Sequence, residues 1–357
     1  MHVLNVKDVN DALPRGLAYL RDSGLARGSR NGNVLVAPGP VATVYKWPDR
    51  RVLFDPDRDA NPFFHLFEAL WILRGRDDVS FLTMFNKRMA EYSDNGSTFH
   101  APYGFRLRRA FGFDQIERAC DMLATDPDSR RVVLQIWDAS LDLGRVSKDL
   151  PCNDMIFCSL RPSPMGDRYM LDIAVANRSN DTIWGAYGAN AVQFSFIQEY
   201  MAAKIGALVG TYTQISYNYH VYTDTPQWVN WSEKNHSGVH VPMNFYDHGG
   251  ITVTPLCRNR ADADALDRDL VLMFALSDES GRFVLADFAE RMWEAEADEM
   301  FKSYGFKTLV LPMLHLLVTR TETHPGLNPG IIDWHAAGAA WVRRRKEAKT
   351  MAEKKEQ

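Results

Sequence analysis

The chain has 357 residues, of which 46% are hydrophobic and 24% are charged. These are ordinary values for a globular protein, so they exclude disorder as the dominant state and allow one large domain or two smaller ones. The formal net charge of -4 gives no global basic field, so the composition does not favour nucleic acid as the main partner.

The cysteine content and the N-terminus indicate a protein of the reducing cytoplasm. Asp8 and Asp11 stand where a secretory signal needs an apolar core, and no apolar run reaches the roughly 18 residues of a membrane span, so we expect no membrane partner. Four cysteines are too few for a disulfide scaffold in a chain of this length, and none of them forms a C-x-x-C pair, so we expect no metal: Cys120, Cys152, Cys158 and Cys257.

The N-terminal part of the chain predicts one strong helix after less regular segments. Residues 1–30 indicate a short helix, followed by a polar loop from Gly24 to Asn33. Residues 34–54 alternate and contain prolines, which is typical of edge strands. Asn61–Arg74 predicts a helix because Asn61 can cap it, Pro62 suits the first turn and apolar residues repeat at helical spacing.

The middle of the chain predicts a sheet and a buried helix. Ala191–Ile205 is mostly apolar and predicts the helix. The expected strands are short segments rich in Val, Ile and aromatic residues: Arg131–Trp137, Met155–Leu160, Tyr169–Ala176 and Thr211–Tyr222.

The C-terminal segment Trp334–Gln357 predicts a helical tail that contains the basic run Arg343–Lys346. We interpret it as a solvated terminal helix, with contact to a polyanion as the alternative.

Cys152 is the candidate nucleophile. It follows Pro151, between a polar loop and a predicted strand, where its sulfur can be presented at the strand start. By itself this is a weak signal, because most cysteines are small buried hydrophobic residues.

Arginines stand at the ends of neighbouring predicted strands. Arg130 and Arg131 lie at a loop-to-strand junction, and Arg178 with Ser179 ends another strand. The planar guanidinium suits phosphate oxygens, and several converging arginines suit a dianion. A surface salt bridge is the alternative for any single arginine, but three of them beside a candidate nucleophile indicate a phosphate site.

Several separated motifs together resemble the thymidylate synthase superfamily, which includes the pyrimidine-nucleotide hydroxymethylases. The resemblance covers roughly Arg27 to Tyr222 and transfers nothing to the residues after it. The motifs are Ser129-Arg130-Arg131, Leu150-Pro151-Cys152, Arg178-Ser179-x-Asp181, Gly185, Asn190 and His220-Val221-Tyr222.

The resemblance implies an α/β fold with a bent, mostly antiparallel mixed sheet. Helices would cover one face, and a homodimer with shared active sites would form through the other. Residues 1–333 would form the catalytic domain, with the resemblance strongest over 27–222, and residues 334–357 the basic helical tail.

The resemblance also implies the chemistry of the nucleophile. Cys152 would add to carbon 6 of a pyrimidine nucleoside monophosphate, which makes carbon 5 a nucleophile toward the methylene of 5,10-methylenetetrahydrofolate. Glu68 would relay protons through ordered water, and Tyr103 would assist proton removal from carbon 5. A helix-surface residue is the less favoured alternative for Glu68, and without the resemblance Tyr103 is equally well read as a packed loop aromatic.

Roles in binding follow from the same resemblance. Arg178, Ser179 and an arginine of the early loop would hold the nucleotide phosphate, and we prefer Arg30 to Arg27 for the third. The remaining roles are phosphate contact in the neighbouring subunit for Arg130 and Arg131, the sugar hydroxyl for His220 and Tyr222, and the folate for Asp181 and Gly185.

Three departures from thymidylate synthase bear on the product. Asn153 follows the nucleophile in place of histidine, and the loop Arg88–His100 holds no tryptophan to cover the methylene intermediate. A more open, polar pocket would admit water and give a hydroxymethyl group, which we favour over methylation. Trp184–Asn190 carries one extra residue, which puts Asn190 at the base-reading position.

Asn190 favours uracil, because an amide can donate to oxygen 4 and accept from the protonated ring nitrogen 3. Cytidylate stays close behind, because the extra residue could aim the amide differently. The alternatives are a true thymidylate synthase, a non-catalytic nucleic-acid-binding protein supported only by the basic tail, and a thiol hydrolase using Cys152 and His220. The last needs an oxyanion hole that the sequence does not identify.

Overall fold

The computed structural model describes residues 1–235, 244–279, 284–321 and 332–356. Within them, eight strands form one mixed sheet in the order β1-β4-β8-β7-β6-β5, with β3 also paired to β8 and β2 to β3. Two pairs are parallel, β1 with β4 and β7 with β8, and the other pairs are antiparallel. The strands are β1 (His2–Val6), β2 (Leu25–Ser29), β3 (Gly32–Val36), β4 (Val41–Tyr45), β5 (Val133–Gln135), β6 (Asn153–Pro162), β7 (Tyr169–Asp181) and β8 (Leu208–Tyr222).

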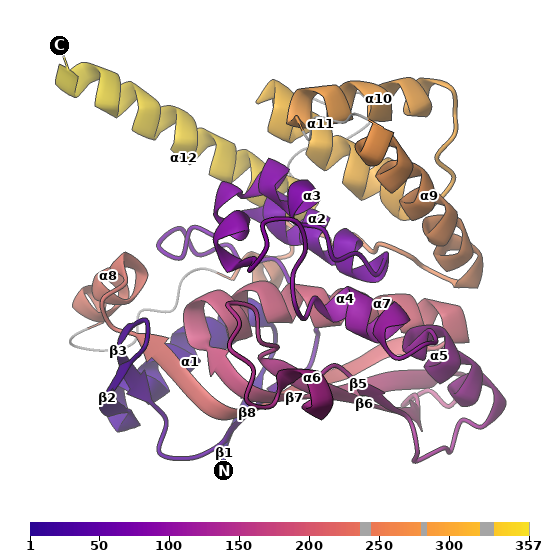
Figure 1. Cartoon of the computed structure of the whole chain (residues 1–357), viewed down its shortest axis with the longest axis horizontal. Coiled ribbons are helices and arrows are strands. Elements are labelled where there is room, and N and C mark those ends of the chain that lie inside the picture. The colour runs from indigo at the N-terminus through magenta and orange to yellow at the C-terminus, as the bar shows by residue number, and fades with distance from the viewer. Residues whose placement is uncertain (236–243, 280–283, 322–331, 357) are drawn as a thin grey trace.

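Helices cover one face of this sheet. Helix α7 lies on the sheet, and α2, α4 and α5 lie on the same side as α7 (Figure 1). The mostly antiparallel α/β fold expected from the sequence is confirmed. The described α-helices are α1 (Val9–Ser23), α2 (Pro62–Leu73), α3 (Val79–Phe85), α4 (Tyr103–Phe105), α5 (Gln115–Thr125), α6 (Ala139–Asp142), α7 (Asn190–Ile205), α8 (Pro226–Lys234), α9 (Arg260–Glu279), α10 (Leu285–Ala297), α11 (Leu311–Thr319) and α12 (Asp333–Glu356).

The opposite face of the sheet carries exposed apolar side chains. Along β6 and β7 the residues alternate, so that Ile156 and Val175 are buried under the helices while Phe157 is 43% exposed. Tyr217 of β8 is 76% exposed. This alternation is the pattern of a sheet with one covered face and one open face.

The helix expected at Asn61–Arg74 is confirmed as α2. The side chain of Asn61 accepts a hydrogen bond from the backbone N–H of Phe64 at 3.1 Å, and Pro62 is the first helical residue. Every residue of α2 is buried, because α7 lies on one side of it and the C-terminal helices lie on the other. The buried helix and the four strands expected in the middle of the chain are also confirmed.

Two expectations for the N-terminal region were wrong. The polar loop expected at Gly24–Asn33 is a hairpin of β2 and β3, and β3 continues the sheet by pairing with β8. β4 is an interior strand between β1 and β8 rather than an edge strand. In both places pairing with strands distant in the sequence overrides the local pattern, which carries no information about those partners.

The C-terminal part adds a layer of helices above α2 and α7 (Figure 1). Glu199 of α7 joins this layer to the sheet domain: its buried carboxylate pairs with Arg51 at 2.5 Å and accepts from the backbone N–H groups of Leu256 at 2.5 Å and Cys257 at 3.0 Å. One side chain therefore satisfies a buried charge and two backbone donors.

Helix α12 begins inside the protein and ends outside it. Trp334 stacks on Phe196, and Trp341 packs edge-on against Phe63. In the basic run, Arg344 and Arg345 pair with Asp59 at 3.0 and 2.6 Å, and the last turns project from the body (Figure 1). The domain division at residue 333 stays a prediction, and Gln357 lies outside the described residues. No helix in the described part of the chain is long and apolar enough to span a membrane.

Replacement of Glu199 by alanine should strongly destabilise the fold. It would leave the Arg51 guanidinium buried without its carboxylate, and loss of one partner of a buried pair costs about 3–5 kcal/mol. Urea unfolding of Glu199→Ala should show this loss. Glu353→Ala, which removes the exposed partner of Lys349 on α12, is the control and should change little. Equal stability of the two variants would contradict the anchoring role of Glu199.

Candidate active site

Cys152 lies directly before β6, beside Arg178 of β7. The Arg178 guanidinium donates to the carbonyl oxygens of Pro151 at 2.7 Å and Leu150 at 3.2 Å, and its Nη2 lies 3.8 Å from the Cys152 sulfur. The arginine thus fixes the backbone that leads into the cysteine and also places a positive charge next to the thiol.

The two cysteines of this region differ in surroundings. Burial raises the pKa of the Cys152 thiol above its ordinary value, and the charge of Arg178 opposes that shift. Cys158 lies in the covered face of β6, where burial raises its pKa strongly and no cation opposes the effect. Only Cys152 therefore combines partial exposure with a neighbouring cation, which is the setting of a reactive thiol.

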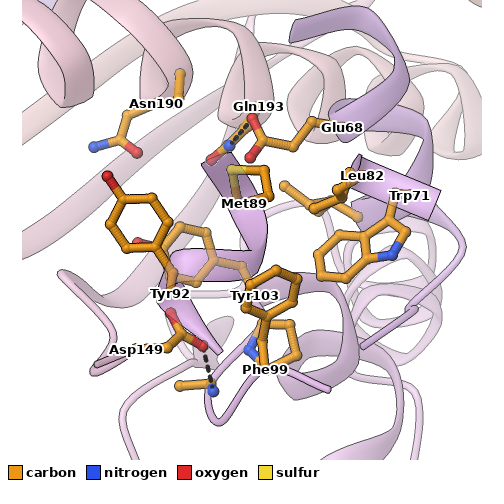
Figure 2. A pocket seen from close by; sticks show the side chains of 14 residues that line it. Glu68, Trp71, Leu82, Met89, Tyr92, Phe99, Tyr103, Asp149, Asn190 and Gln193 are labelled. Carbon is orange, nitrogen blue, oxygen red and sulfur yellow. Dashed lines mark hydrogen bonds between the residues drawn. The ribbon is translucent and has the colours of Figure 1, made fainter. Parts of the chain in front are cut away.

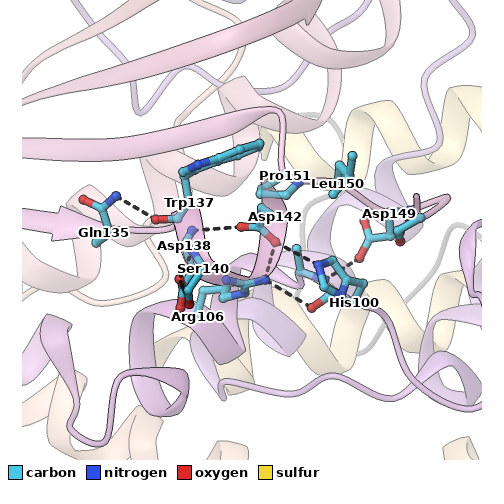
Figure 3. A network of polar contacts seen from close by, with 12 residues as sticks. His100, Arg106, Gln135, Trp137, Asp138, Ser140, Asp142, Asp149, Leu150 and Pro151 are labelled. Carbon is cyan, nitrogen blue, oxygen red and sulfur yellow. Dashed lines mark hydrogen bonds and ion pairs between the residues drawn. The ribbon is translucent and has the colours of Figure 1, made fainter. Parts of the chain in front are cut away.

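A buried carboxylate ties the loop before β6 to the turn before α4 (Figure 3). Asp142 pairs with the His100 ring at 2.8 Å, accepts from Arg106 at 2.8 Å, and accepts from the backbone N–H of Asp138 at 2.8 Å. Asp149, closer to the cysteine, accepts from the backbone N–H of Ala101 at 2.8 Å. These bonds hold the cysteine loop against the segment that carries Tyr103.

A cavity of about 240 Å³ lies between α2, the start of α7 and this segment (Figure 2). Its polar side chains are Glu68, Tyr92, Tyr103, Asp149, Asn190 and Gln193. The rest of its wall is apolar and aromatic: Trp71, Ile72, Leu82, Met89, Phe99, Ala101, Pro102 and Ala189.

The expectation of a polar pocket wall from the loop Arg88–His100 does not hold at this cavity, although Arg88 and Glu91 of the loop line a second, larger one. Ser93, Asn95 and Thr98 bond to one another, with Ser93 Oγ donating to the Thr98 carbonyl at 2.7 Å and Asn95 Nδ2 donating to Thr98 Oγ1 at 3.0 Å. The loop turns Met89, Tyr92 and Phe99 to the cavity instead. Short polar side chains in a tight turn satisfy their own backbone, so composition alone misjudged which residues reach the cavity.

Glu68 points into this cavity from α2. Gln193 Nε2 donates to its Oε2 at 2.7 Å, and burial raises the pKa of the carboxyl to about 7 (Figure 2). The reading of Glu68 as a helix-surface residue is therefore wrong. A carboxyl with a pKa near neutrality can both accept and release a proton there.

Tyr103 and Asn190 line the same cavity. Burial, and then the charges of Cys152 and Asp149, raise the pKa of the Tyr103 phenol, which keeps it protonated. Asn190 is the first residue of α7, and its Oδ1 accepts from Asn153 Nδ2 at 3.2 Å. The structure thus places Asn153, the residue after the candidate nucleophile, against Asn190.

The turn before α7 is π-helical. Thr182–Ala189 forms this segment, and Gly188 departs from helical dihedral angles within it. A π turn takes up an additional residue without breaking the helix that follows. It therefore accommodates the extra residue noted in the sequence, while Asn190 still faces the cavity.

A second cavity of about 640 Å³ shares Tyr92 with the first one and is lined by Arg30, Tyr222 and Trp184, among others. Arg30 lies at the turn of the β2–β3 hairpin, where Asn31 Nδ2 donates to the Tyr222 hydroxyl at 3.5 Å. Arg27 lies on β2 and does not line this cavity. Of the two rival arginines, the fold brings Arg30 to the site.

Asp181, Ser179 and His220 meet at adjacent ends of β7 and β8. In the parallel pairing of β7 with β8, the backbone of Asp181 lies opposite that of His220, and the backbone of Ser179 lies opposite that of Asn218. One oxygen of Asp181 accepts from the backbone N–H of Trp184 at 2.5 Å, whereas its Oδ2 is buried and has no partner among the described residues. Burial raises the pKa of this carboxyl, and His220 opposes that shift.

Gly185 lies against the amide of Asn180. A Cβ atom at Gly185 would stand 2.8 Å from Asn180 Oδ1, which is closer than real contacts allow. The missing side chain therefore makes room for Asn180, a residue to which the sequence gave no role.

Arg130 and Arg131 are the predicted residues that the chain does not bring to its own site. Both are exposed before β5, and neither has a hydrogen bond or ion pair with any residue that the structure describes. Sequence reasoning in turn missed Gln193, Asp149 and Asn180. The sequence signal for Gln193 is its position as a polar residue inside an apolar helix. Asp149 and Asn180 have no such signal, apart from standing next to residues of the motifs.

Comparison with known proteins fits this geometry. The sequence profile of thymidylate synthase matches residues 63–240. Deoxyuridylate hydroxymethyltransferase of Pseudomonas phage M6 is 40% identical over 357 aligned residues, which cover 98% of this chain and 95% of that protein. The chain belongs to the thymidylate synthase family. The long alignment also shows that the residues after Tyr222 are shared with a relative.

Two further family members align over shorter stretches. Deoxyuridylate hydroxymethyltransferase of Bacillus phage SP01 is 42% identical over 213 residues, 55% of this chain and 54% of that protein. A putative thymidylate synthase of Methanothermobacter marburgensis is 33% identical over 130 residues, 36% of this chain and 54% of that protein. The resemblance drawn from the separated motifs is confirmed.

Replacement of Glu68 by glutamine should stabilise the chain at neutral and alkaline pH. Burial raises the pKa of the Glu68 carboxyl from the ordinary value of 4.5 to about 7. Between these values the folded chain keeps a proton that the unfolded chain has lost, so wild-type stability falls as the pH rises through this window. Urea unfolding across pH should show that the gain of Glu68→Gln vanishes below pH 4.5 and is full above 7. A gain that does not vary with pH would contradict the assigned burial of the charge.

Proposed function

We propose that this chain transfers a hydroxymethyl group to carbon 5 of deoxyuridylate and takes the one-carbon unit from 5,10-methylenetetrahydrofolate. The observation that carries the proposal is the Cys152 thiol, which lies 3.8 Å from the Arg178 guanidinium. Tyr103 connects this thiol to the cavity: it lines the cavity together with Glu68 and Asn190, and its pKa is raised by burial and by the charge of Cys152. Membership of the thymidylate synthase family and the names of two relatives support the same reaction.

Cys152 would act as the covalent nucleophile. Its thiolate forms a bond to carbon 6 of the uracil, and the electron pair of the carbon 5–carbon 6 double bond moves toward oxygen 4. Arg178 stabilises the thiolate. Asn190 would donate to oxygen 4 and accept from the N–H of nitrogen 3, which favours uracil. When the adduct collapses, carbon 5 keeps the new substituent and the sulfur leaves as the thiolate.

Glu68 and Tyr103 would handle the proton of carbon 5. With a pKa of about 7, Glu68 can take a proton through water and release it again at neutral pH. The Tyr103 phenol stays protonated, so it serves as a hydrogen-bond donor that orients water or the base rather than as a base itself.

The sugar and phosphate would lie beside the larger cavity, whose lining includes Arg30 and Tyr222 but not Arg178, Ser179 or His220. Arg30, Arg178 and Ser179 would hold the phosphate, because guanidinium groups match its oxygens. His220 and Tyr222 would bond the sugar hydroxyl; their rings lie 5.3 Å apart, edge to face.

The folate would lie near Asp181 and Trp184. Gly185, which follows Trp184 in the chain, lies against Asn180. The unpartnered Oδ2 of Asp181 suits the N–H donors of a pterin, and Trp184, 44% exposed over Arg58, offers an aromatic face. When bound, the folate supplies a methylene carbon at the oxidation level of formaldehyde. The residues at hand therefore fit this group.

Water access would decide the product. Tyr92 lines both cavities and is 47% exposed, so among the described residues this loop would leave the reacting carbon open to water. Hydration of the exocyclic methylene on the nucleotide adds a hydroxyl and leaves the folate unoxidised. We expect the reaction to take place in the cytoplasm, where the thiol stays reduced.

The open face of the sheet would form a homodimer. Val133, Phe157 and Tyr217 are exposed apolar residues on strands β5, β6 and β8, and their burial in a second copy would be favourable. Such packing would carry Arg130 and Arg131, which have no partner within the described chain, to the phosphate of the other subunit.

Product analysis tests the reaction. With deoxyuridylate and methylenetetrahydrofolate, the nucleotide should gain one CH₂O and tetrahydrofolate should be released. Cys152→Ser should abolish the release of tritium from carbon 5, while Cys158→Ser, the matched control from the same strand, should keep most of it. A gain of one CH₂ with rising dihydrofolate absorbance would show a thymidylate synthase instead, and equal loss in both cysteine variants would remove Cys152 from its role.

Mixing of inactive variants tests the shared site. When Cys152→Ser and Arg130→Ala subunits exchange, one site of each heterodimer would have both an intact thiol and an intact Arg130 of the partner subunit, so activity should return in part. Cys152→Ser mixed with Glu68→Gln is the control, because Cys152 and Glu68 would each serve the site of their own subunit, so each site of the heterodimer would carry one of the two changes and neither would be intact. No recovery in verified Cys152→Ser and Arg130→Ala heterodimers would exclude sharing.

A further inference from the structure

Buried side-chain amides form a continuous row from the backbone carbonyl of Ala186 to the start of β6. Gln214 Nε2 donates to the Ala186 carbonyl oxygen at 2.8 Å, and Asn180 Nδ2 donates to Gln214 Oε1 at 2.9 Å. Asn190 Nδ2 then donates to Asn180 Oδ1 at 3.0 Å, and Asn153 Nδ2 donates to Asn190 Oδ1 at 3.2 Å. Gln214, Asn180 and Asn190 each accept on one side and donate on the other, whereas Asn153 ends the row as a donor whose Oδ1 has no partner among the described residues.

The direction of this row is set at its Ala186 end. A backbone carbonyl only accepts, so Gln214 must turn its NH₂ group to Ala186 and its oxygen to Asn180. Asn180 must then turn its NH₂ group to Gln214 and its oxygen to Asn190, which fixes Asn190 in the same way. Ser216 Oγ, 3.0 Å from Asn180 Nδ2, takes the second hydrogen of that group.

Burial makes reversal of the row costly. The four side chains are at most 6% exposed, so an amide that turned over would face like groups without water to satisfy them. Gly185 supports the arrangement, because any side chain there would collide with Asn180 Oδ1. In the low-dielectric interior each bond also polarises the next one.

We propose that this row determines base specificity: Gln214 and Asn180 hold the Asn190 amide in one orientation and so select uracil over cytosine without touching the nucleotide. The inference rests on the proposed function, in which Asn190 reads the base. Gln214 and Asn180 are accordingly positioning residues.

The chemistry of the two bases explains why orientation matters. Uracil presents an acceptor at oxygen 4 and a donor at nitrogen 3, whereas neutral cytosine presents a donor at its amino group and an acceptor at nitrogen 3. A freely turning asparagine can match either edge by exchanging its oxygen and NH₂ group. With one hydrogen of Nδ2 committed to Asn180 and one lone pair of Oδ1 committed to Asn153, Asn190 offers the base one donor and one acceptor in a fixed order.

The test compares two buried glutamines. Gln214→Met keeps the length of the side chain but removes the orientation set by Ala186. Gln198→Met is the control. Gln198 of α7 is as buried as Gln214, and it donates to the carbonyls of Leu171 on β7 and Thr211 on β8, away from the row. The readout is the ratio of kcat/KM for deoxyuridylate to kcat/KM for deoxycytidylate.

Gln214→Met should lower this ratio roughly tenfold or more. Once the Asn190 amide can turn over, it can match cytosine, so cytosine no longer leaves a buried donor or acceptor without a partner. Gln198→Met should lower both rates together if it perturbs the fold, and leave the ratio unchanged. Asn180→Ser, whose hydroxyl can donate or accept, should lower the ratio in the same way and covers the case in which Gln214→Met does not fold.

The outcomes separate the two claims. If the wild type is active and both Gln214→Met and Asn180→Ser keep the wild-type ratio, the role of the row is overturned and the proposed function stands. A wild type that is inactive with both nucleotides would overturn the proposed function and this inference together.

Discussion

The contact between Arg178 and the backbone before β6 is the interaction on which the site depends. One guanidinium satisfies the carbonyls of Leu150 and Pro151 and stands beside the sulfur of Cys152. The parallel pairing of β7 with β8 then brings His220 and Tyr222 to the same end of the sheet. Nucleophile, cation and sugar-binding candidates are thus assembled by strand register rather than by a flexible loop.

Burial determines the pKa of Glu68 and the orientation of the buried side-chain amides. Glu68 points from α2 toward Gln193 of α7, and burial there raises the pKa of its carboxyl to about 7. The same exclusion of water makes an amide reversal costly in the row from Gln214 to Asn153.

The proposed homodimer would join two observations: the open face of the sheet, and Arg130 and Arg131, which have no partner among the residues that the structure describes. Exposed aromatic residues such as Phe157 and Tyr217 alternate with buried ones, so a second copy can cover that face without altering the covered one. A site completed across such an interface depends on assembly as well as on folding of the single chain.

The sequence by itself determined the elements whose signals are local. The cap at Asn61 with Pro62 predicted α2, and segments rich in Val, Ile and aromatic residues predicted β6, β7 and β8. The separated motifs predicted the family and, as its site residues, Cys152, Arg178, Asn190 and His220. Each of these depends on neighbours along the chain or on residue type, which a single sequence contains.

Tertiary structure alone decided what depends on distant partners. The hairpin of β2 and β3, the interior place of β4 and the apolar cavity face of the loop Arg88–His100 follow from pairing and packing that no local pattern encodes. The role of Gly185 and the bonding of Asn180 required the turn before α7 to meet β7 and β8. A buried amide has a defined direction only when all its partners are in place, and those partners come from four separate segments of the chain.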